Sequence, residues 1–265
     1  MPPAISTHDL TRRFDTVTAV NALSLDVQAG EVFGLLGPNG AGKTTTIKML
    51  ITLLPPSEGI ARVAGHDVVT ESALVRRSIG YVPQLVSADG ALTGAQNLRL
   101  SAQLYHVARA EREPRIRDAL AFMGLEDAAD RMVRTYSGGM IRRLELAQAM
   151  LHRPTVLFLD EPTVGLDPIA RAAVWEHVRR LRDRDGATIL LTTHYMEEAD
   201  ELCDRISIML AGKIVATGTP VELKAEVGPT ATLDDVFARI AGAAIETEGS
   251  YRDVARARRT ARRLG

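Results

Sequence analysis

Residues 37–44 read Gly-Pro-Asn-Gly-Ala-Gly-Lys-Thr and match the pattern G-x-x-x-x-G-K-[ST] at every fixed position. Residues 31–36 before them, which have no polar side chain after Glu31, predict a short buried strand, and a helical pattern begins at Lys43. In such a loop, backbone N–H groups converge on triphosphate oxygens, because glycines leave that approach open. Lys43 then reaches the β- and γ-phosphates, while the Thr44 hydroxyl ligates Mg²⁺. We expect the nucleotide to contact Gly37, Pro38, Asn39, Gly40, Ala41, Gly42, Lys43, Thr44 and Thr45.

Further apolar runs predict more buried strands, at residues 79–82, 156–159 and 188–192. The first helix is expected to continue from Lys43 to the proline pair 55–56, because proline ends a helix. Its apolar face consists of Ile47, Leu50, Ile51 and Leu54. Between the last two strands, Asp167 and Pro168 suit the N-cap and the first position of another helix.

Residues 89–151 carry long helical periodicities and little strand signal, so we interpret them as an inserted helical subdomain. Apolar strands that alternate with helices predict an α/β fold around a mostly parallel central sheet. A helical insertion then interrupts this sheet.

The apolar run at 156–159 ends in Asp160 and Glu161. Because α/β sheets place ligands at the carboxyl ends of their strands, this strand would deliver Asp160 to the Mg²⁺ shell. Glu161 would lie beside the γ-phosphate and orient or deprotonate the attacking water. Apolar strands also often end in an Asp that caps a helix, and the pairing with the phosphate loop favours the catalytic interpretation.

The sequence Tyr-Ser-Gly-Gly-Met at residues 136–140 begins an amphipathic helix whose apolar face is Met140, Leu144, Ala147 and Leu151. Ser137, Gly138 and Gly139 at a helix N-terminus offer exposed N–H groups and the positive end of the helix dipole, which form a second anion site. The alternative is a plain N-cap and a flexible turn. A chain with one phosphate loop has no obvious use for this second site within itself.

In this order the motifs resemble those of the ATP-binding subunits of ATP-binding-cassette (ABC) transporters, over residues 5–223. Residues 37–44 resemble the family's Walker A motif, 157–161 its Walker B motif, and 136–140 its signature, usually written LSGGQ. The signature departs at Tyr136 and Met140, where we expect altered packing and retained phosphate contact.

The same resemblance assigns four single residues. Gln84 matches the Q-loop, a Mg²⁺ contact and hinge to the helical subdomain, and Asp167 belongs to the D-loop. His194 matches the switch histidine, and Phe14 stands where the family places an aromatic ring that stacks on adenine. The plainer alternatives are a loop residue for Gln84, a structural histidine for His194 and a core residue for Phe14.

The resemblance implies a P-loop NTPase fold with an N-terminal antiparallel β subdomain. We expect an ABC ATPase domain at residues 1–225 with a helical insertion at about 88–152. Residues 226–265 are expected to form a C-terminal helical extension with a basic tail. The catalytic set is Lys43, Gln84, Glu161 and His194, and the metal set is Thr44, Gln84 and Asp160.

Composition and missing motifs exclude other classes. With 32 Lys+Arg against 33 Asp+Glu, the net charge of −1 argues against nucleic acid as a partner. A Rossmann dehydrogenase is excluded because no G-x-G-x-x-G follows the first strand. A GTPase would need Asn/Thr-Lys-x-Asp, and no lysine here is followed two residues later by Asp. A P-loop kinase would need neither the Ser137 helix nor His194.

The sequence also indicates where the chain is located and which partners it has. No apolar run is long enough to span a bilayer, the N-terminus has no secretory pattern, and Cys203 is the single cysteine. We therefore expect a cytoplasmic chain, and the resemblance implies that it is peripheral on the inner face of the cell membrane. The resemblance implies a separate membrane-spanning permease and a second ATPase subunit, either another copy or a similar chain.

The C-terminal region indicates the kind of transporter. Thr232 and Asp235 form a predicted capping box, followed by an apolar face of Leu233, Val236, Phe237 and Ile240. This stretch resembles exporter ATPases of the daunorubicin/doxorubicin-resistance type, which implies export of a hydrophobic drug, antibiotic or lipid. The alternatives are a soluble ABC ATPase acting on ribosomes or DNA, and an importer ATPase. The arginine-rich residues 251–265 predict either a solvated terminus or a basic helix that serves as an electrostatic clamp at the membrane.

Overall fold

The computed structural model describes residues 2–247, so the predicted basic helix at 251–265 lies outside the described residues. The strands are β1 Ile5–Phe14, β2 Val17–Val27, β3 Val32–Leu36, β4 Glu58–Val63, β5 His66–Asp67, β6 Ile79–Val82, β7 Val156–Asp160, β8 Thr188–Thr193, β9 Arg205–Leu210 and β10 Lys213–Gly218. The α-helices are α1 Lys43–Leu50, α2 Ser72–Ser78, α3 Gly94–Leu104, α4 Arg109–Phe122, α5 Gly138–Met150, α6 Pro168–Asp185, α7 Met196–Leu202, α8 Pro220–Ala225 and α9 Leu233–Thr247.

The central sheet has the strand order β10-β9-β3-β8-β7-β6. Its ladders from β9 to β6 are parallel, and only β10 joins antiparallel. Every residue of β3, β7 and β8 is buried, which explains why these strands are continuous apolar runs in the sequence. Along β7, Leu157 and Leu159 face one core while Val156 and Phe158 face the other. The predicted mostly parallel sheet is confirmed.

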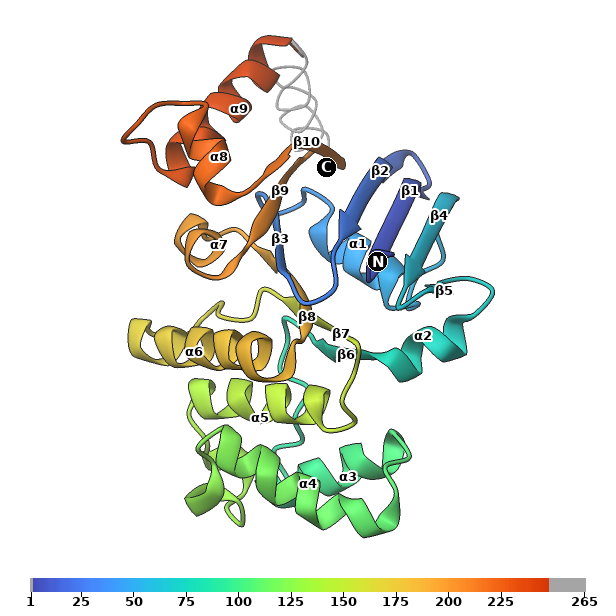
Figure 1. Cartoon of the computed structure of the whole chain (residues 1–265), viewed down its shortest axis with the longest axis vertical. Helices are drawn as coiled ribbons and strands as arrows, with labels where there is room; N and C mark the ends of the chain where they lie inside the picture. The colour runs from blue at the N-terminus through green and yellow to red at the C-terminus, as the bar shows by residue number, and fades with distance from the viewer. Residues whose placement is uncertain (1, 248–265) are drawn as a thin grey trace, which may run out of the picture.

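A second sheet, β2-β1-β4-β5, is antiparallel throughout and forms the N-terminal β subdomain. Helix α1 lies between the two sheets and contacts β2, β4 and β7 (Figure 1). Its Ile47 and Leu50 are fully buried in the core that also contains Phe33 and Phe158. The helix that follows the phosphate loop is therefore held from both sides.

The insertion between β6 and β7 forms a helical lobe at the bottom of Figure 1. Helices α3, α4 and α5 pack on one another, and α5 also packs on α6 and on β6. Thr93 caps α3 with a capping box, and Ser137 caps α5 by accepting from the N–H of Met140. Within the insertion, two short 3₁₀ turns, Glu126–Ala128 and Val133–Thr135, stand between α4 and α5. The predicted helical subdomain thus corresponds to three α-helices.

The first helix is shorter than predicted. It ends at Leu50, because Thr52 adopts a positive φ of 67° and the N–H groups of Leu53 and Leu54 both donate to the Lys48 carbonyl. Prolines 55–56 therefore follow a turn and do not end the helix. The buried face of α5 is as predicted at Leu144, Ala147 and Leu151, while Met140 is only partly buried.

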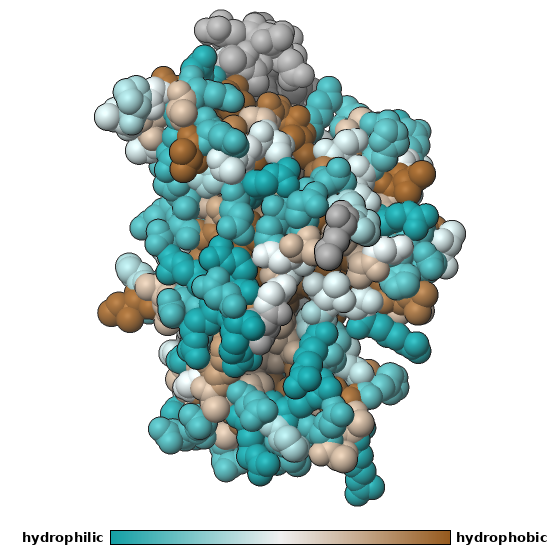
Figure 2. Space-filling model, in the orientation of Figure 1, coloured by the Kyte–Doolittle hydropathy of each residue, from teal (hydrophilic) through white to brown (hydrophobic). Residues whose placement is uncertain are grey.

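Helix α9 of the C-terminal region packs against α7 and α8 at the top of Figure 1. Its capping box is present: Thr232 N–H donates to Asp235 at 2.8 Å, and Asp235 N–H donates back to the Thr232 hydroxyl at 3.2 Å. Leu233 and Val236 are buried in the same core as Val32 and Leu36 of β3. Figure 2 shows a mainly hydrophilic face with hydrophobic residues in small, separate groups. Among the described residues, no helix is long and apolar enough to cross a membrane.

Candidate active site

The phosphate loop leaves the carboxyl end of β3, between β8 and β9 in the sheet, and enters α1 at Lys43. Gly42 has a φ of 109°, which L side chains rarely adopt. A Cβ there would also overlap the Ala19 carbonyl, and one at Gly37 would overlap the carbonyl of Met209. These two glycines let the loop fold back against β2 and β9. The predicted strand, loop and helix are confirmed.

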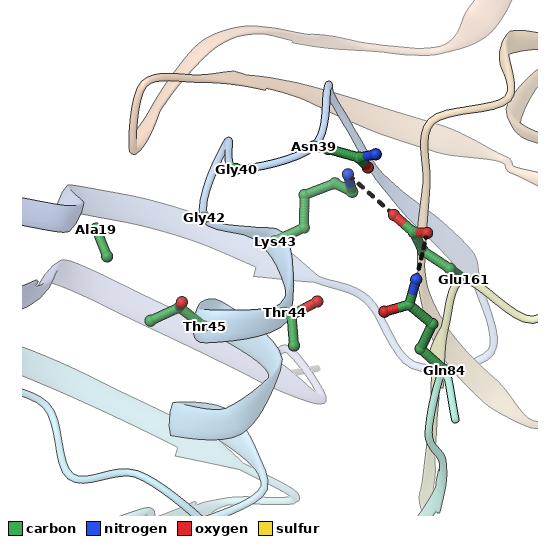
Figure 3. Close-up of a pocket in the computed structure, with 9 residues that line it drawn as sticks. All are labelled: Ala19, Asn39, Gly40, Gly42, Lys43, Thr44, Thr45, Gln84 and Glu161. Atoms are coloured by element: carbon green, nitrogen blue, oxygen red, sulfur yellow. Dashed lines mark hydrogen bonds and ion pairs between the residues drawn. The ribbon is translucent and has the colours of Figure 1, made fainter. Parts of the chain in front are cut away.

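A cavity of about 320 Å³ opens beside this loop (Figure 3). Its lining combines one residue of β2, the loop, the start of α1, the second residue after β6 and the first residue after β7. The lining residues are Ala19, Asn39, Gly40, Gly42, Lys43, Thr44, Thr45, Gln84 and Glu161. The structure thus brings Gln84 and Glu161, far apart in the sequence, to the phosphate loop.

The carboxylate of Glu161 is the centre of this arrangement (Figure 3). Lys43 Nζ lies 3.2 Å from Oε1, and Gln84 Nε2 donates to Oε2 at 3.1 Å. Nδ1 of His194 lies 3.3 Å from Oε1, without hydrogen-bond geometry. Glu161 itself has a positive φ of 49°, and its N–H donates to Thr192. Its position is therefore fixed by both backbone and side chain.

Lys43 is buried and makes two more bonds, from Nζ to the carbonyls of Gly37 at 2.7 Å and Pro38 at 3.1 Å. These bonds hold its ammonium group under the loop, next to the cavity. A cation in this position is suited to phosphate oxygens because it combines full charge with a flexible stem.

Asp160, one residue before Glu161, is only 1% exposed. Its Oδ1 accepts from the Thr44 hydroxyl at 3.2 Å and from the Thr192 hydroxyl at 2.6 Å. Burial, together with the Asp160 charge, raises the pKa of Tyr81 to about 12. Thr44 and Asp160 present oxygen atoms, the ligand type that Mg²⁺ prefers. Within residues 2–247, no cluster of three His, Cys, Asp or Glu side chains could hold a metal by itself.

His194 also borders a second hollow, on the other side of Asn39. That hollow is lined by Gly37, Pro38, Asn39, His194, Met196 and Phe237. Phe237 comes from α9, so the C-terminal extension reaches the edge of the phosphate loop. The His194 ring packs on Tyr195, with their centroids 4.3 Å apart.

Several predicted site residues do not line the cavity. The ring of Phe14 is 42% exposed, and the Arg12 guanidinium lies 4.6 Å from its centroid. Ser137 and Gly138 are exposed at the N-terminus of α5. Asp167 caps α6 by accepting from Ala170 N–H at 2.9 Å. The nucleotide contacts predicted for these residues remain predictions.

The glycines of the signature have a packing role in this chain. A Cβ on Gly139 would lie 2.9 Å from the Cβ of Ala170, and one on Gly138 would lie 3.2 Å from Leu166. The N-terminus of α5 therefore packs against the first turn of α6 and the loop that precedes it. This contact explains their small size without reference to a ligand.

Two residues of the site were not predicted. Thr192, on β8, contacts both acids: its hydroxyl donates to Asp160, and it accepts from the Glu161 N–H. In the sequence it is marked only as a threonine in another strand of the same predicted sheet. Ala19 lines the cavity from β2, and no pattern in the sequence distinguishes it from other strand residues.

The phosphate loop and the adjacent Asp-Glu pair define a P-loop nucleoside triphosphatase. Residues 20–164 match the family model described as ABC transporter. The chain is 49% identical over 225 residues to the daunorubicin/doxorubicin resistance ATP-binding protein DrrA of Streptomyces peucetius, covering 85% of this chain and 68% of that protein. It is 45% identical over 230 residues to the Nod factor export ATP-binding protein I of Burkholderia lata, covering 86% and 75%.

Solved structures agree with these relatives. An ATP-binding subunit of an ABC transporter superposes with a TM-score of 0.80 at 31% identity, covering 90% of this chain and 99% of the other. The cbiO1 protein of Clostridium perfringens, part of the ABC transporter complex cbiONQ, superposes with a TM-score of 0.79 at 27% identity, covering 85% and 92%. The chain belongs to the ABC transporter family, as an ATP-binding subunit with ATPase activity. The resemblance seen in its motifs is confirmed.

Proposed function

We propose that the chain hydrolyses Mg²⁺-ATP with Glu161 as the general base. Lys43 binds the β- and γ-phosphates, Gln84 and His194 orient the reacting groups, and Glu161 accepts the proton of the attacking water. The observation that carries this proposal is the convergence of Lys43, Gln84 and His194 on one buried carboxylate beside the phosphate loop.

The oxygen atoms of Thr44, Asp160 and Gln84 fit a Mg²⁺ ion. A site with one carboxylate suits Mg²⁺ because this ion keeps waters and takes substrate phosphates as further ligands. When bound, the ion supplies positive charge that neutralises the phosphates. The hydroxyl of Thr192 holds Asp160 in place at 2.6 Å, which fixes the carboxylate for this role.

The working unit contains two ATPase subunits. Ser137 and Gly138 are exposed on the helical lobe and absent from the lining of their own chain's cavity. Their N–H groups are therefore available to a phosphate held by another subunit. In this arrangement Asp167 and Phe14 also complete the nucleotide site, as the family resemblance implies.

A separate membrane-spanning permease docks on the helical lobe and on the loop after Gln84. Leu85 and Val86 in this loop are 80% and 61% exposed, and adjacent exposed apolar side chains favour a protein contact. The chain would then lie on the inner face of the cell membrane, held by its partner. The cbiO1 protein, which belongs to a multi-subunit complex, supports such a partner.

The cargo is a hydrophobic drug, antibiotic or lipid that leaves the cell. Support comes from relatives named for daunorubicin/doxorubicin resistance and for Nod factor export. We further propose that residues 1–225 form the ATPase unit with the insertion at 88–152, and that 226–265 are an extension. The packing of α9 on α7 and α8 supports an extension attached to the ATPase.

Purification of the tagged chain from its own cells tests the proposal. We expect recovery of a membrane-spanning protein and ATP hydrolysis that chelation of Mg²⁺ abolishes. Recovery with a solute-binding protein and a permease would contradict export. Recovery with ribosomes, and without a membrane protein, would contradict transport.

A further inference from the structure

Helix α5 carries a buried ion pair that the proposed chemistry does not use. Arg142 is 5% exposed and Glu145 2% exposed, and Arg142 Nη1 donates to Glu145 Oε2 at 2.9 Å. Neither residue lines the nucleotide cavity. A buried pair of this kind contributes little net stability, because desolvation offsets the attraction between its charges. The role of the pair is therefore inferred from the other groups that the two side chains bind.

Both side chains bind the loop that follows β6. Arg142 donates from Nη1 to the Pro83 carbonyl at 2.7 Å and from Nη2 to the Gln84 carbonyl at 3.1 Å. Glu145 Oε1 accepts from the Ser87 N–H at 2.5 Å and from the Ser87 hydroxyl at 2.9 Å. The pair therefore ties down residues on both sides of the exposed Leu85 and Val86.

Gln84 is held at two points that lead to different parts of the molecule. Its side-chain amide donates to Glu161 in the cavity, and its carbonyl accepts from Arg142 on α5. The same helix begins at the exposed Ser137 cap. An α-helix transmits displacement along its length because its backbone hydrogen bonds keep it rigid. One side-chain pair thus connects the Gln84 carbonyl to the helix that begins at Ser137.

We propose that Arg142 and Glu145 are positioning residues for ATP hydrolysis, which join the Gln84 loop to α5 so that the two move together. This inference rests on the proposed role of Gln84 beside Glu161. In it, the pair sets the position of Gln84 and of the Ser137 end of α5 without touching nucleotide.

The test compares purified full-length variants. Glu145→Leu leaves a buried, unpaired arginine and is expected to destabilise the fold. The double variant Arg142→Met/Glu145→Leu replaces the pair with apolar side chains and is expected to regain stability. The control is Arg99→Met/Glu113→Leu, which removes an exposed pair with bonds of 2.7 and 3.0 Å in the same lobe, away from the Gln84 loop.

We expect the Arg142→Met/Glu145→Leu variant to melt like the control while its kcat falls on the order of 10²-fold, the effect of misplacing a reacting group by about 1 Å. Its KM for ATP should stay unchanged, because the substitutions do not touch Lys43 or the phosphate loop, which make the proposed phosphate contacts. In the wild type, Mg²⁺-ATP should change the rate of amide hydrogen exchange at residues 83–87 and at residues 137–141. In this variant, the exchange rate should change at residues 83–87 alone. A stable double variant with wild-type kcat, or with both responses, would overturn the proposal.

If the Arg142→Met/Glu145→Leu variant does not fold, another variant tests the proposal. Arg142→Lys keeps the charge next to Glu145 but lacks the planar fork that binds two carbonyls. We expect a lower kcat at unchanged KM, and an unchanged kcat would overturn the proposal. Failure of the wild-type chain to hydrolyse Mg²⁺-ATP at all would instead contradict the proposed function.

Discussion

Lys43 Nζ lies 3.2 Å from Oε1 of Glu161, with only 4% and 6% of the two side chains exposed. The cation proposed to hold phosphate and the carboxylate proposed to activate water are thus direct partners. A phosphate bound by Lys43 shares this ammonium group with Glu161, so nucleotide binding and the availability of the base are linked. Gln84 donates to the other oxygen of Glu161, so the carboxylate has a second hydrogen-bond partner that does not depend on Lys43.

Glu161→Gln should bind ATP and hydrolyse it far more slowly. A positioned general base contributes about 10²–10⁴-fold, and the amide has nearly the same shape but cannot accept the proton. Single-turnover hydrolysis and equilibrium nucleotide binding measure the two effects separately. ATP should also strengthen dimerisation in this variant, as sized by light scattering. The matched control is Glu176→Gln, an exposed glutamate on α6. Turnover of Glu161→Gln at the control's rate would refute the assignment of the base.

Lys43→Met should weaken nucleotide binding and also destabilise the protein without nucleotide. Removal of one partner from a buried pair costs about 3–5 kcal/mol, and Gln84, which still donates to Glu161, favours the lower end. Lys43→Met/Glu161→Gln should regain most of this free energy of unfolding, because no buried charge is left unpaired. Urea denaturation of the three variants measures the coupling. Purely additive effects would show that the two groups do not interact.

Sequence patterns predict this site well where the signal is local. The phosphate loop, the Asp160–Glu161 strand end and the Thr232–Asp235 capping box depend on neighbours in the chain, and all lie where expected. The end of α1 was missed because Thr52 turns into the left-handed region, which its residue type does not indicate. Arg142 and Glu145 were missed for another reason. Their i, i+3 spacing is typical of a solvated helix face, and their bonds to the distant loop after β6 are not visible in the sequence.

Acidification from pH 7.5 to pH 5 should lower the free energy of unfolding through two histidines. Burial lowers the pKa of His152 and of His177 below the ordinary histidine value of 6.5. The unfolded chain therefore binds protons that the folded chain resists, so stability is full above pH 6.5 and is lost as the pH falls. The slope is at most about 1.4 kcal/mol per pH unit for each histidine.

Urea denaturation at several pH values measures this slope. His152 accounts for part of it because its ring stacks on Tyr105 and its Nε2 donates to the Ile79 carbonyl at 2.9 Å, which requires no second proton. His152→Gln should flatten the pH dependence, whereas the exposed control His106→Gln should not. An unchanged slope in His152→Gln would show that this histidine does not titrate with unfolding.

Tyr136→Phe should cost about 0.5–1.5 kcal/mol, the net contribution of one hydrogen bond, because the Ala128 carbonyl still accepts from the Arg131 N–H at 3.0 Å. The buried Tyr136 hydroxyl donates to the Ala128 carbonyl at 2.6 Å. This bond joins the start of the signature to the 3₁₀ turn Glu126–Ala128. The expected packing role of Tyr136 therefore has a defined partner. Nucleotide binding should be unaffected, because Tyr136 does not line the cavity. A loss of ATP binding equal to the loss of stability would contradict this division of roles.

The same hydroxyl explains why position 94 is a glycine, and a double-mutant cycle checks that explanation. A Cβ on Gly94 would overlap Oη of Tyr136, so Gly94→Ala should destabilise the wild type by forcing the ring from its place. In the Tyr136→Phe background the overlap is gone, and the same alanine should cost less or stabilise the helix, since alanine favours helix over glycine by about 1 kcal/mol. The two effects on the free energy of unfolding should therefore be non-additive by more than about 0.5 kcal/mol, as expected for residues in contact. Strict additivity in urea denaturation would mean that some other neighbour excludes a side chain at position 94.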